Sequence, residues 1–189
     1  SLERTEESTA DSSAIAQEGF PVVSPWQVDL PENHQMDPVV FAQLHADLES
    51  ADVYAMVTVK DGVIIDEYYQ EGYDETSVFP LHSCTKSFTS ALVGIAIEQG
   101  YFTSVDDPLS DYLPQVLDLA DTGKQQITLR HLLTHTSGLE WYEWAGRSNW
   151  QEFRSAENWV DYILNRNLVA TPGTVFAYST GNSHLLAAA

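Results

Sequence analysis

The sequence predicts a mixed α/β (α+β) fold, in which an antiparallel sheet is flanked by helices. Two runs rich in β-forming residues flank Asp61-Gly62 within residues 53–73, a pattern typical of a β-hairpin. Helical patterns follow from residue 86 onward, so strands come first and helices come after. The hydrophobic share of 43%, including 11% aromatic residues, is enough to form a packed core.

The elements of the first half follow in order. Residues 20–38 are rich in proline and are expected to form an extended lead-in. A helix is predicted over residues 38–51, because Asp37 can cap it and Pro38 fits its first turn. After the hairpin, a helix is predicted over residues 86–99, with Gly100 as its candidate C-cap.

The second half is predicted to be mostly helical. Residues 103–114 have the character of a loop with a short helix. Thr128 is expected to cap a short helix that stops by Gly138, and a longer helix is predicted over residues 155–165. Residues 171–189 begin with a Pro-Gly turn and end in the opening of another helix.

Charge and composition exclude several classes of protein. The chain has 8 basic and 28 acidic residues, and its net charge of −20 would repel a phosphate backbone, so nucleic acid is not expected as a partner. Cys84 is the single cysteine, which excludes an intrachain disulfide and a cysteine-based metal site. No apolar run reaches the roughly 18 residues that a membrane span needs.

The polar opening of the chain bears on its localisation. Residues 1–19 have two interpretations: a tether left after a leader is removed, or an ordinary frayed terminus. We expect a bacterial protein that is secreted, periplasmic or associated with the cell envelope.

Ser83 and Lys86 are the first candidates for chemistry. They lie three positions apart at the start of a predicted helix, where positions i and i+3 share a face. Free backbone N–H groups at a helix start stabilise an alkoxide or an oxyanion. A lysine acts as a general base only where its surroundings bring its pKa from about 10.4 down to roughly 7–8. The same spacing also fits a solvated lysine on a helix surface.

Other polar residues offer weaker signals. Tyr178 could relay a proton near such a pair, or it could belong to the core. His131 and His135 have the i, i+4 spacing of zinc ligands, but no glutamate follows His131 to act as a base. We therefore expect both histidines to bond nearby backbone, and no metal site is predicted.

Two further nucleophile arrangements are less favourable. A serine triad with His82 as base is disfavoured, because the adjacent side chain leaves the helix start in another direction and no Gly-x-Ser-x-Gly elbow is present. Cys84 is rotated away from Ser83 and Lys86, and we expect it to pack under the helix.

Three collinear stretches resemble the serine beta-lactamase-like hydrolases, a superfamily that holds class C beta-lactamases, D-Ala-D-Ala carboxypeptidases and family VIII esterases. The stretches are HSCTKSFTSALVGIAIEQGYFTSVDDPLSDYLP, ITLRHLLTHTSGL and TPGTVFAYSTGNSHLL. The resemblance covers roughly residues 50–189 and implies a beta-lactamase/transpeptidase-like fold with an all-helical subdomain at about residues 103–170. On this basis residues 38–189 are the N-terminal part of the catalytic domain, and residues 1–37 are a polar tether and lead-in.

The resemblance also implies roles for single residues. Ser83 matches the acylated nucleophile, Lys86 the lysine that takes its proton, and Tyr178 the tyrosine that relays a proton to the leaving group. The backbone N–H of Ser83 would supply half of the oxyanion hole. Thr180 stands where the family has an asparagine and Asn182 follows two positions on, so both are candidate substrate-binding residues and efficient beta-lactam hydrolysis is not expected. The LRHLLTHTSGL stretch is a structural hallmark without chemistry.

The implied function is a serine hydrolase that acts through an acyl-enzyme on a small ester, amide or D-amino-acid peptide, without metal or cofactor. The alternative is a catalytically weak, penicillin-binding-like protein that binds peptidoglycan-type peptides or a partner. The family's third motif, Lys-Thr-Gly or His-x-Gly, would lie beyond residue 189. We therefore expect the chain to be the N-terminal part of an enzyme, completed by a C-terminal remainder and inactive without it.

Overall fold

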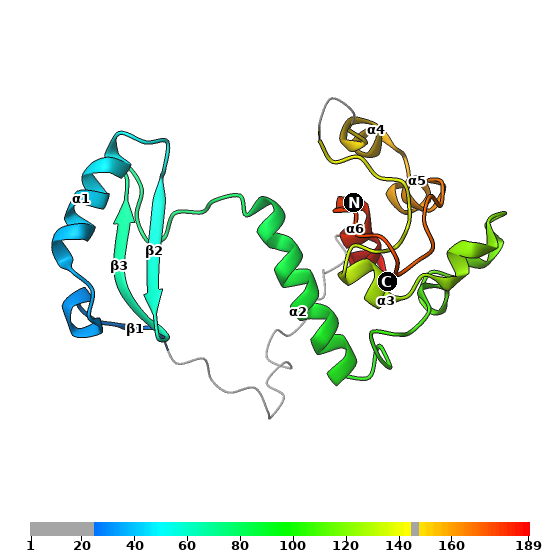
Figure 1. Cartoon of the computed structure of the whole chain (residues 1–189), viewed down its shortest axis with the longest axis horizontal. Helices are drawn as coiled ribbons and strands as arrows, with labels where there is room; N and C mark the ends of the chain where they lie inside the picture. Colours follow the sequence, from blue (N-terminus) through cyan, green and yellow to red (C-terminus); the bar gives the residue numbers. More distant parts are fainter. Residues whose placement is uncertain (1–24, 145–147) are drawn as a thin grey trace, which may run out of the picture. The chain divides into compact units, whose positions relative to one another are not determined.

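The structure is a computed structural model that describes residues 25–144 and 148–189. The chain divides into two units, residues 1–79 and residues 80–189. The described part of the first unit holds the sheet, and that of the second holds most of the helices (Figure 1). A mixed α/β architecture with a small sheet is what the sequence predicts.

The sheet of the first unit contains the predicted hairpin. Strands β2 (Ala55–Lys60) and β3 (Val63–Tyr69) pair antiparallel across Asp61-Gly62, whose φ angles of 51° and 81° are both positive, as a tight two-residue turn requires. A third strand, β1 (Gln27–Val28), pairs parallel with β3 and gives the order β1-β3-β2. This strand and the 3-10 turn η2 (Pro31–His34) form within the predicted lead-in.

Helix α1 (Pro38–Glu49) confirms the prediction for residues 38–51. The Asp37 side chain accepts a hydrogen bond from the Val39 N–H at 2.9 Å, which caps the helix as its sequence indicates. His45 of α1 bonds Asp66 of β3, with 3.0 Å between Nε2 and Oδ2. The His45 ring also contacts the ring of Tyr68 in β3, with centroids 5.3 Å apart, and the two contacts hold the helix against this strand.

The second unit begins with the segment that carries the candidate nucleophile. A 3-10 turn, η3 (His82–Cys84), leads into α2 (Thr85–Glu98), and Gly100 follows with a φ of 78°. Three short 3-10 turns then lead to the remaining helices. The turns are η4 (Leu109–Asp111), η5 (Pro114–Asp118) and η6 (Thr122–Gln126). The helices are α3 (Leu129–Leu133), α4 (Trp150–Ser155), α5 (Trp159–Leu164) and α6 (Thr180–Ala188).

Two boundaries differ from the sequence prediction. Thr128 caps α3 as predicted, but the helix ends at Leu133, because His135 adopts a left-handed conformation with a φ of 56°. The helix predicted over residues 155–165 is shorter, because α5 runs only from Trp159 to Leu164, and residues 150–155 form a separate helix, α4, that the sequence does not predict. The cap of α5 is Asn158, whose side chain accepts a hydrogen bond from the Asp161 N–H at 3.1 Å.

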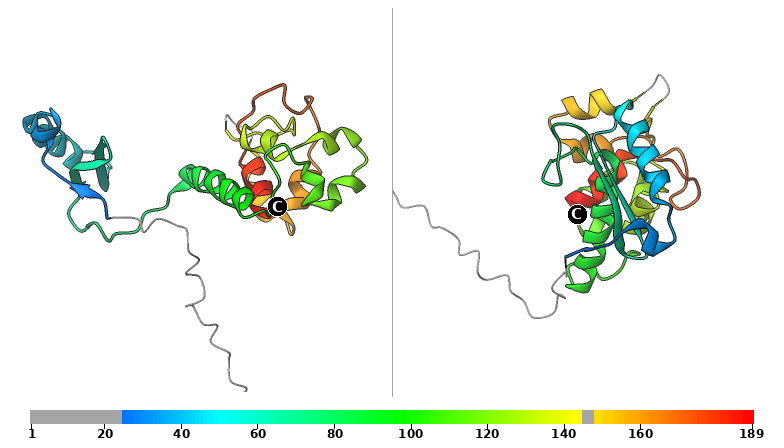
Figure 2. Two further views of the ribbon diagram at one scale, coloured as in Figure 1. Left: turned by 90° about the horizontal axis from the view of Figure 1, so that it is seen from below. Right: turned by 90° about the vertical axis from the view of Figure 1, so that its left-hand side faces the viewer.

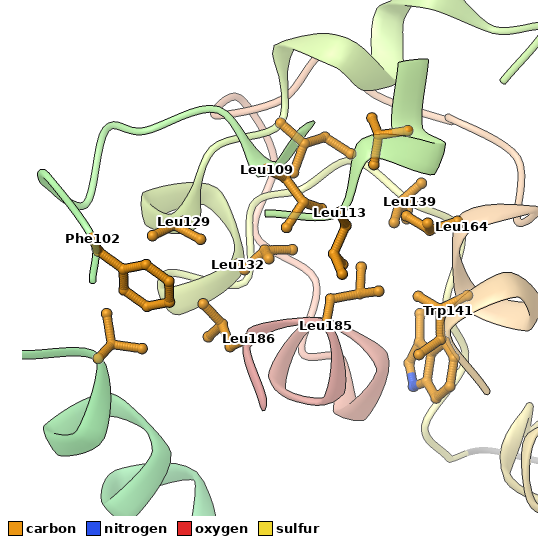
Figure 3. Close-up of a cluster of buried hydrophobic side chains, with 14 of the residues drawn as sticks. Phe102, Leu109, Leu113, Leu129, Leu132, Leu139, Trp141, Leu164, Leu185 and Leu186 are labelled. Carbon is orange, nitrogen blue, oxygen red and sulfur yellow. The ribbon is translucent and has the colours of Figure 1, made fainter. Parts of the chain in front are cut away.

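One hydrophobic core holds the second unit together (Figure 3). Its completely buried residues come from η4 (Leu109), α3 (Leu129 and Leu132) and α6 (Leu185), and α3 packs against α6. Helix α2 contacts α6 as well, and Figure 2 shows the two helices side by side. The starts of α2 and α6, which carry the candidate catalytic residues, are therefore fixed by the same core. Among the residues that the structure describes, no helix is long and apolar enough to cross a membrane.

Candidate active site

Ser83 and Lys86 meet at the start of α2. The turn η3 and the first turn of α2 place them on one face, and Lys86 Nζ donates a hydrogen bond to Ser83 Oγ at 3.2 Å. No side chain caps η3 or α2, so no capping side chain occupies the first backbone N–H groups of either element. The Ser83 side chain is exposed and Lys86 is half-buried, so the pair is open to a substrate.

A pocket of about 440 Å³ adjoins this pair. Ser83 and Lys86 contribute one wall, and Thr180 and His184 of α6 contribute another. Glu143, from the segment that precedes α4, also lines it. The volume falls within the range of roughly 300–1,000 Å³ that is usual for small-molecule sites.

Tyr178 lies beside Lys86, just before α6. Lys86 Nζ is 5.1 Å from the centroid of the Tyr178 ring. The Tyr178 ring stacks on His135, with centroids 4.8 Å apart, and on Trp144, with centroids 5.5 Å apart. The structure thus brings together the serine, the lysine and the tyrosine that lie up to 95 positions apart in the sequence (178 − 83).

Thr180 is tied to a carboxylate that the sequence does not reveal. Glu143 Oε2 accepts a hydrogen bond from the Thr180 N–H at 3.1 Å, and Glu143 Oε1 accepts one from the Thr180 hydroxyl at 2.5 Å. The Trp141 indole N–H also donates to Glu143 Oε2. Glu143 therefore anchors the first residue of α6 at the rim of the pocket. The two residues are 37 positions apart, so no local sequence pattern predicts this contact.

Asn182, for which the sequence suggests a substrate contact, is placed elsewhere. Its side chain is 1% exposed and lies outside the pocket lining. Its Oδ1 accepts a hydrogen bond from the Ser137 hydroxyl at 2.8 Å. The reason is the helix itself: two positions after Thr180, a side chain has turned by about 200° around the axis of α6. Asn182 therefore packs α6 against residues 134–139.

His131 and His135 both bond backbone, as the sequence indicates. His131 Nδ1 accepts from the Thr128 N–H at 3.2 Å, within the cap of its own helix. His135 Nδ1 accepts from the Ser179 N–H at 3.1 Å. Burial lowers the pKa of His135, and the nearby charge of Lys86 lowers it further. Within residues 25–144 and 148–189, no group of three or more His, Cys, Asp and Glu side chains could hold a metal ion.

Of the two neighbours of Ser83, Cys84 differs from its expected placement. Cys84 is exposed instead of packed under the helix. His82 lines the pocket and adopts a left-handed conformation with a φ of 46°. It is thus a possible competitor for the role of base, and a test of Lys86 has to account for it.

Comparison with known proteins points to one family. A family model described as Beta-lactamase matches residues 40–189. The D-alanyl-D-alanine-carboxypeptidase/endopeptidase AmpH of Escherichia coli K12 is 34% identical over 113 residues, which cover 59% of this chain and 29% of AmpH. Esterase EstB of Burkholderia gladioli is 30% identical over 119 residues, which cover 60% of this chain and 30% of EstB.

A solved structure agrees with these matches. The crystal structure of a Bacteroides dorei protein assigned as a beta-lactamase is similar with a TM-score of 0.60 and 30% identity. The match covers 79% of this chain and 44% of that protein. The chain spans a third or less of the length of the curated relatives that it matches.

Proposed function

The chain belongs to the beta-lactamase family, and on that basis we propose that it carries the nucleophile, base and proton relay of a serine hydrolase that works through an acyl-enzyme. The observation that carries the proposal is the 3.2 Å hydrogen bond from Lys86 Nζ to Ser83 Oγ at the edge of a pocket. A nucleophile and a base in hydrogen-bond contact are the arrangement that such chemistry requires.

The proposed reaction has two halves. Lys86 Nζ takes the hydroxyl proton of Ser83 while Ser83 Oγ attacks the carbonyl carbon of an ester or amide. The negative charge on the carbonyl oxygen is stabilised by the backbone N–H of Ser83. The intermediate collapses as Tyr178 gives a proton to the departing alcohol or amine, and Lys86 passes the proton that it took from Ser83 to Tyr178. In the second half, water gives a proton to Lys86 as it attacks the acyl carbon, and that proton passes to Ser83 Oγ as the acid leaves.

The proposed substrates are small esters, amides and D-amino-acid peptides. The names of two relatives support this range, since one is a D-alanyl-D-alanine carboxypeptidase/endopeptidase and the other an esterase. The pocket wall also includes Trp150, which gives it an apolar surface beside the polar groups.

Beta-lactams are proposed to be poor substrates. The residue two positions after Tyr178 is Thr180, which has no side-chain amide to donate to a lactam carbonyl or side-chain amide. Its single hydroxyl hydrogen is already donated to Glu143 Oε1. Thr180 therefore has an acceptor oxygen to offer but no free hydrogen for the carbonyl of a substrate amide.

The test is hydrolysis of p-nitrophenyl acetate by the full-length natural polypeptide and its Ser83→Ala variant. Ser83 is exposed, so its loss should leave the fold intact, which circular dichroism would verify. We expect the variant to lose at least about 10³-fold in kcat/KM. Turnover by Ser83→Ala close to that of the natural protein would refute the proposal. Binding of a peptidoglycan-type peptide without turnover by the unmodified protein would favour the penicillin-binding-like alternative.

A further inference from the structure

We propose that His135 is the residue that positions Tyr178 for proton transfer. This inference rests on the proposed function, because it assumes that Tyr178 protonates the leaving group. Neither the sequence pattern nor the family resemblance gives His135 such a role. The role follows from the contacts between residues 134–136 and the segment that carries Tyr178.

His135 holds the backbone on both sides of Tyr178. Its carbonyl oxygen accepts a hydrogen bond from the Ala177 N–H at 2.9 Å, and its Nδ1 accepts one from the Ser179 N–H at 3.1 Å. A single residue therefore fixes the position immediately before Tyr178 and the position immediately after it. The direction in which the tyrosine side chain leaves the backbone is set by these two bonds.

The ring of His135 adds a third contact. It stacks on the Tyr178 ring with an interplanar angle of 27° and centroids 4.8 Å apart. The left-handed backbone of His135, with a φ of 56°, turns its carbonyl and its ring toward the same segment. This conformation is unfavourable for a non-glycine residue, and the three contacts to residues 177–179 offset its cost.

The contact depends on a neutral imidazole. Nδ1 accepts a hydrogen only when it carries none, so the proton of the neutral ring is on Nε2. Lys86 and Glu143 are the charged groups whose fields reach the ring, and Tyr178 is the titratable group stacked on it. Burial and Lys86 favour the neutral form, whereas Glu143 opposes them. Protonation of Nδ1 would place two N–H groups against each other and break the bond to Ser179.

His131 supplies a matched control. Its Nδ1 also accepts a backbone N–H, from Thr128 at 3.2 Å, and it lies four positions before His135 in the same segment. Its bond, however, closes the cap of α3 and involves no residue next to Tyr178. A change at His131 removes the same kind of interaction without touching the proposed proton donor.

The experiment compares two acetate esters in the full-length natural polypeptide. p-Nitrophenyl acetate has a leaving group that needs no proton, and ethyl acetate has the same acyl group with a leaving group that does. His135→Phe keeps an aromatic ring and loses the acceptor, while His135→Asn tolerates a positive φ and keeps an acceptor oxygen. His131→Asn is the control, and Tyr178→Phe is made alone and together with His135→Phe.

We expect His135→Phe to lower kcat/KM for ethyl acetate by about 10- to 100-fold, because small misplacements of a catalytic group are that costly. The same variant should change kcat/KM for p-nitrophenyl acetate by no more than about threefold. At pH 8, His131→Asn and His135→Asn should change kcat/KM for either ester by no more than about threefold. In the Tyr178→Phe background, adding His135→Phe should change either rate by less than about threefold, because the group being positioned is gone.

Acidification gives a second, independent measurement. The ethyl acetate to p-nitrophenyl acetate rate ratio should fall as the pH is lowered through the titration of His135, and the ratio should stay level in His135→Asn. The inference is overturned if His135→Phe slows both esters equally, if its effect multiplies with that of Tyr178→Phe, or if His135→Asn keeps the acid dependence. If Tyr178→Phe leaves ethyl acetate hydrolysis unchanged, the proposed role of Tyr178 falls, and that result is distinct from the others.

Discussion

Replacing Lys86 separates a base from a mere positive charge. Lys86→Ala removes the group whose Nζ lies 3.2 Å from Ser83 Oγ, whereas Lys86→Arg keeps a cation that does not give up its proton. A positioned general base contributes about 10²–10⁴ in rate, which is roughly 2.7–5.4 kcal/mol of transition-state stabilisation. If Lys86 is the base, both variants should lose that much, because neither has a nitrogen that can accept the serine proton.

The fold should tolerate both changes. Besides the bond to Ser83, the alanine replacement removes the cation–π contact of Lys86 Nζ with the Tyr178 ring, whose centroid is 5.1 Å away. A partly exposed cation–π contact contributes about 0.5–1 kcal/mol, so Lys86→Ala should lower Tm by no more than about 4 °C in a protein of this size or larger.

The assay is kcat/KM for p-nitrophenyl acetate, measured beside thermal unfolding of the same samples. A loss below about tenfold in Lys86→Ala, or a Lys86→Arg variant within about tenfold of the natural protein, would refute the assignment of Lys86 as base. His82 would then be the next residue to replace, because it lines the same pocket.

Three further predictions follow from the site. Tyr178→Phe should lower ethyl acetate hydrolysis by at least about 10²-fold and p-nitrophenyl acetate hydrolysis by less than about tenfold, and equal losses would mean that Tyr178 only shapes the pocket. Nitrocefin turnover should be slow and should rise in Thr180→Asn, because the new amide has two N–H hydrogens and can donate one to Glu143 and one to a substrate; an unchanged rate would count against this explanation. Burial lowers the pKa of His135 and of His184. Below about pH 6.5 the unfolded chain therefore binds protons that the native state does not. The free energy of unfolding should fall as the pH drops from 7.5 to 5.5. The urea midpoint reports this fall, which should shrink when both histidines are replaced by asparagine; a midpoint that rises on acidification would contradict it.

Local chemistry explains why several elements are predictable from the sequence. Asp37 caps α1 through its own side chain, and Asp61-Gly62 forms a turn between two strands that are adjacent in sequence. The third strand β1 is two residues long and pairs with residues 36 positions later, so no local pattern announces it. Helix α4 escapes prediction because it has six residues and no side-chain cap.

The same distinction applies to the site. Ser83 and Lys86 are neighbours on one helical turn, so their contact follows from spacing alone. Glu143 reaches Thr180 across 37 positions and His135 reaches Ser179 across 44, and such contacts exist only once the core has joined α3 to α6. Asn182 shows the opposite failure: it is near the motif in sequence, but the helix turns it into the interior.

Acylation of Ser83 is tested most directly by the mass of the full-length protein after exposure to a fluorophosphonate. We expect one covalent adduct per chain, located by peptide mass spectrometry on Ser83 and absent from Ser83→Ala. Prior incubation with a hydrolysable ester should slow its formation. An adduct on another residue, or continued ester hydrolysis by a protein that the reagent does not label at Ser83, would contradict the acyl-enzyme mechanism.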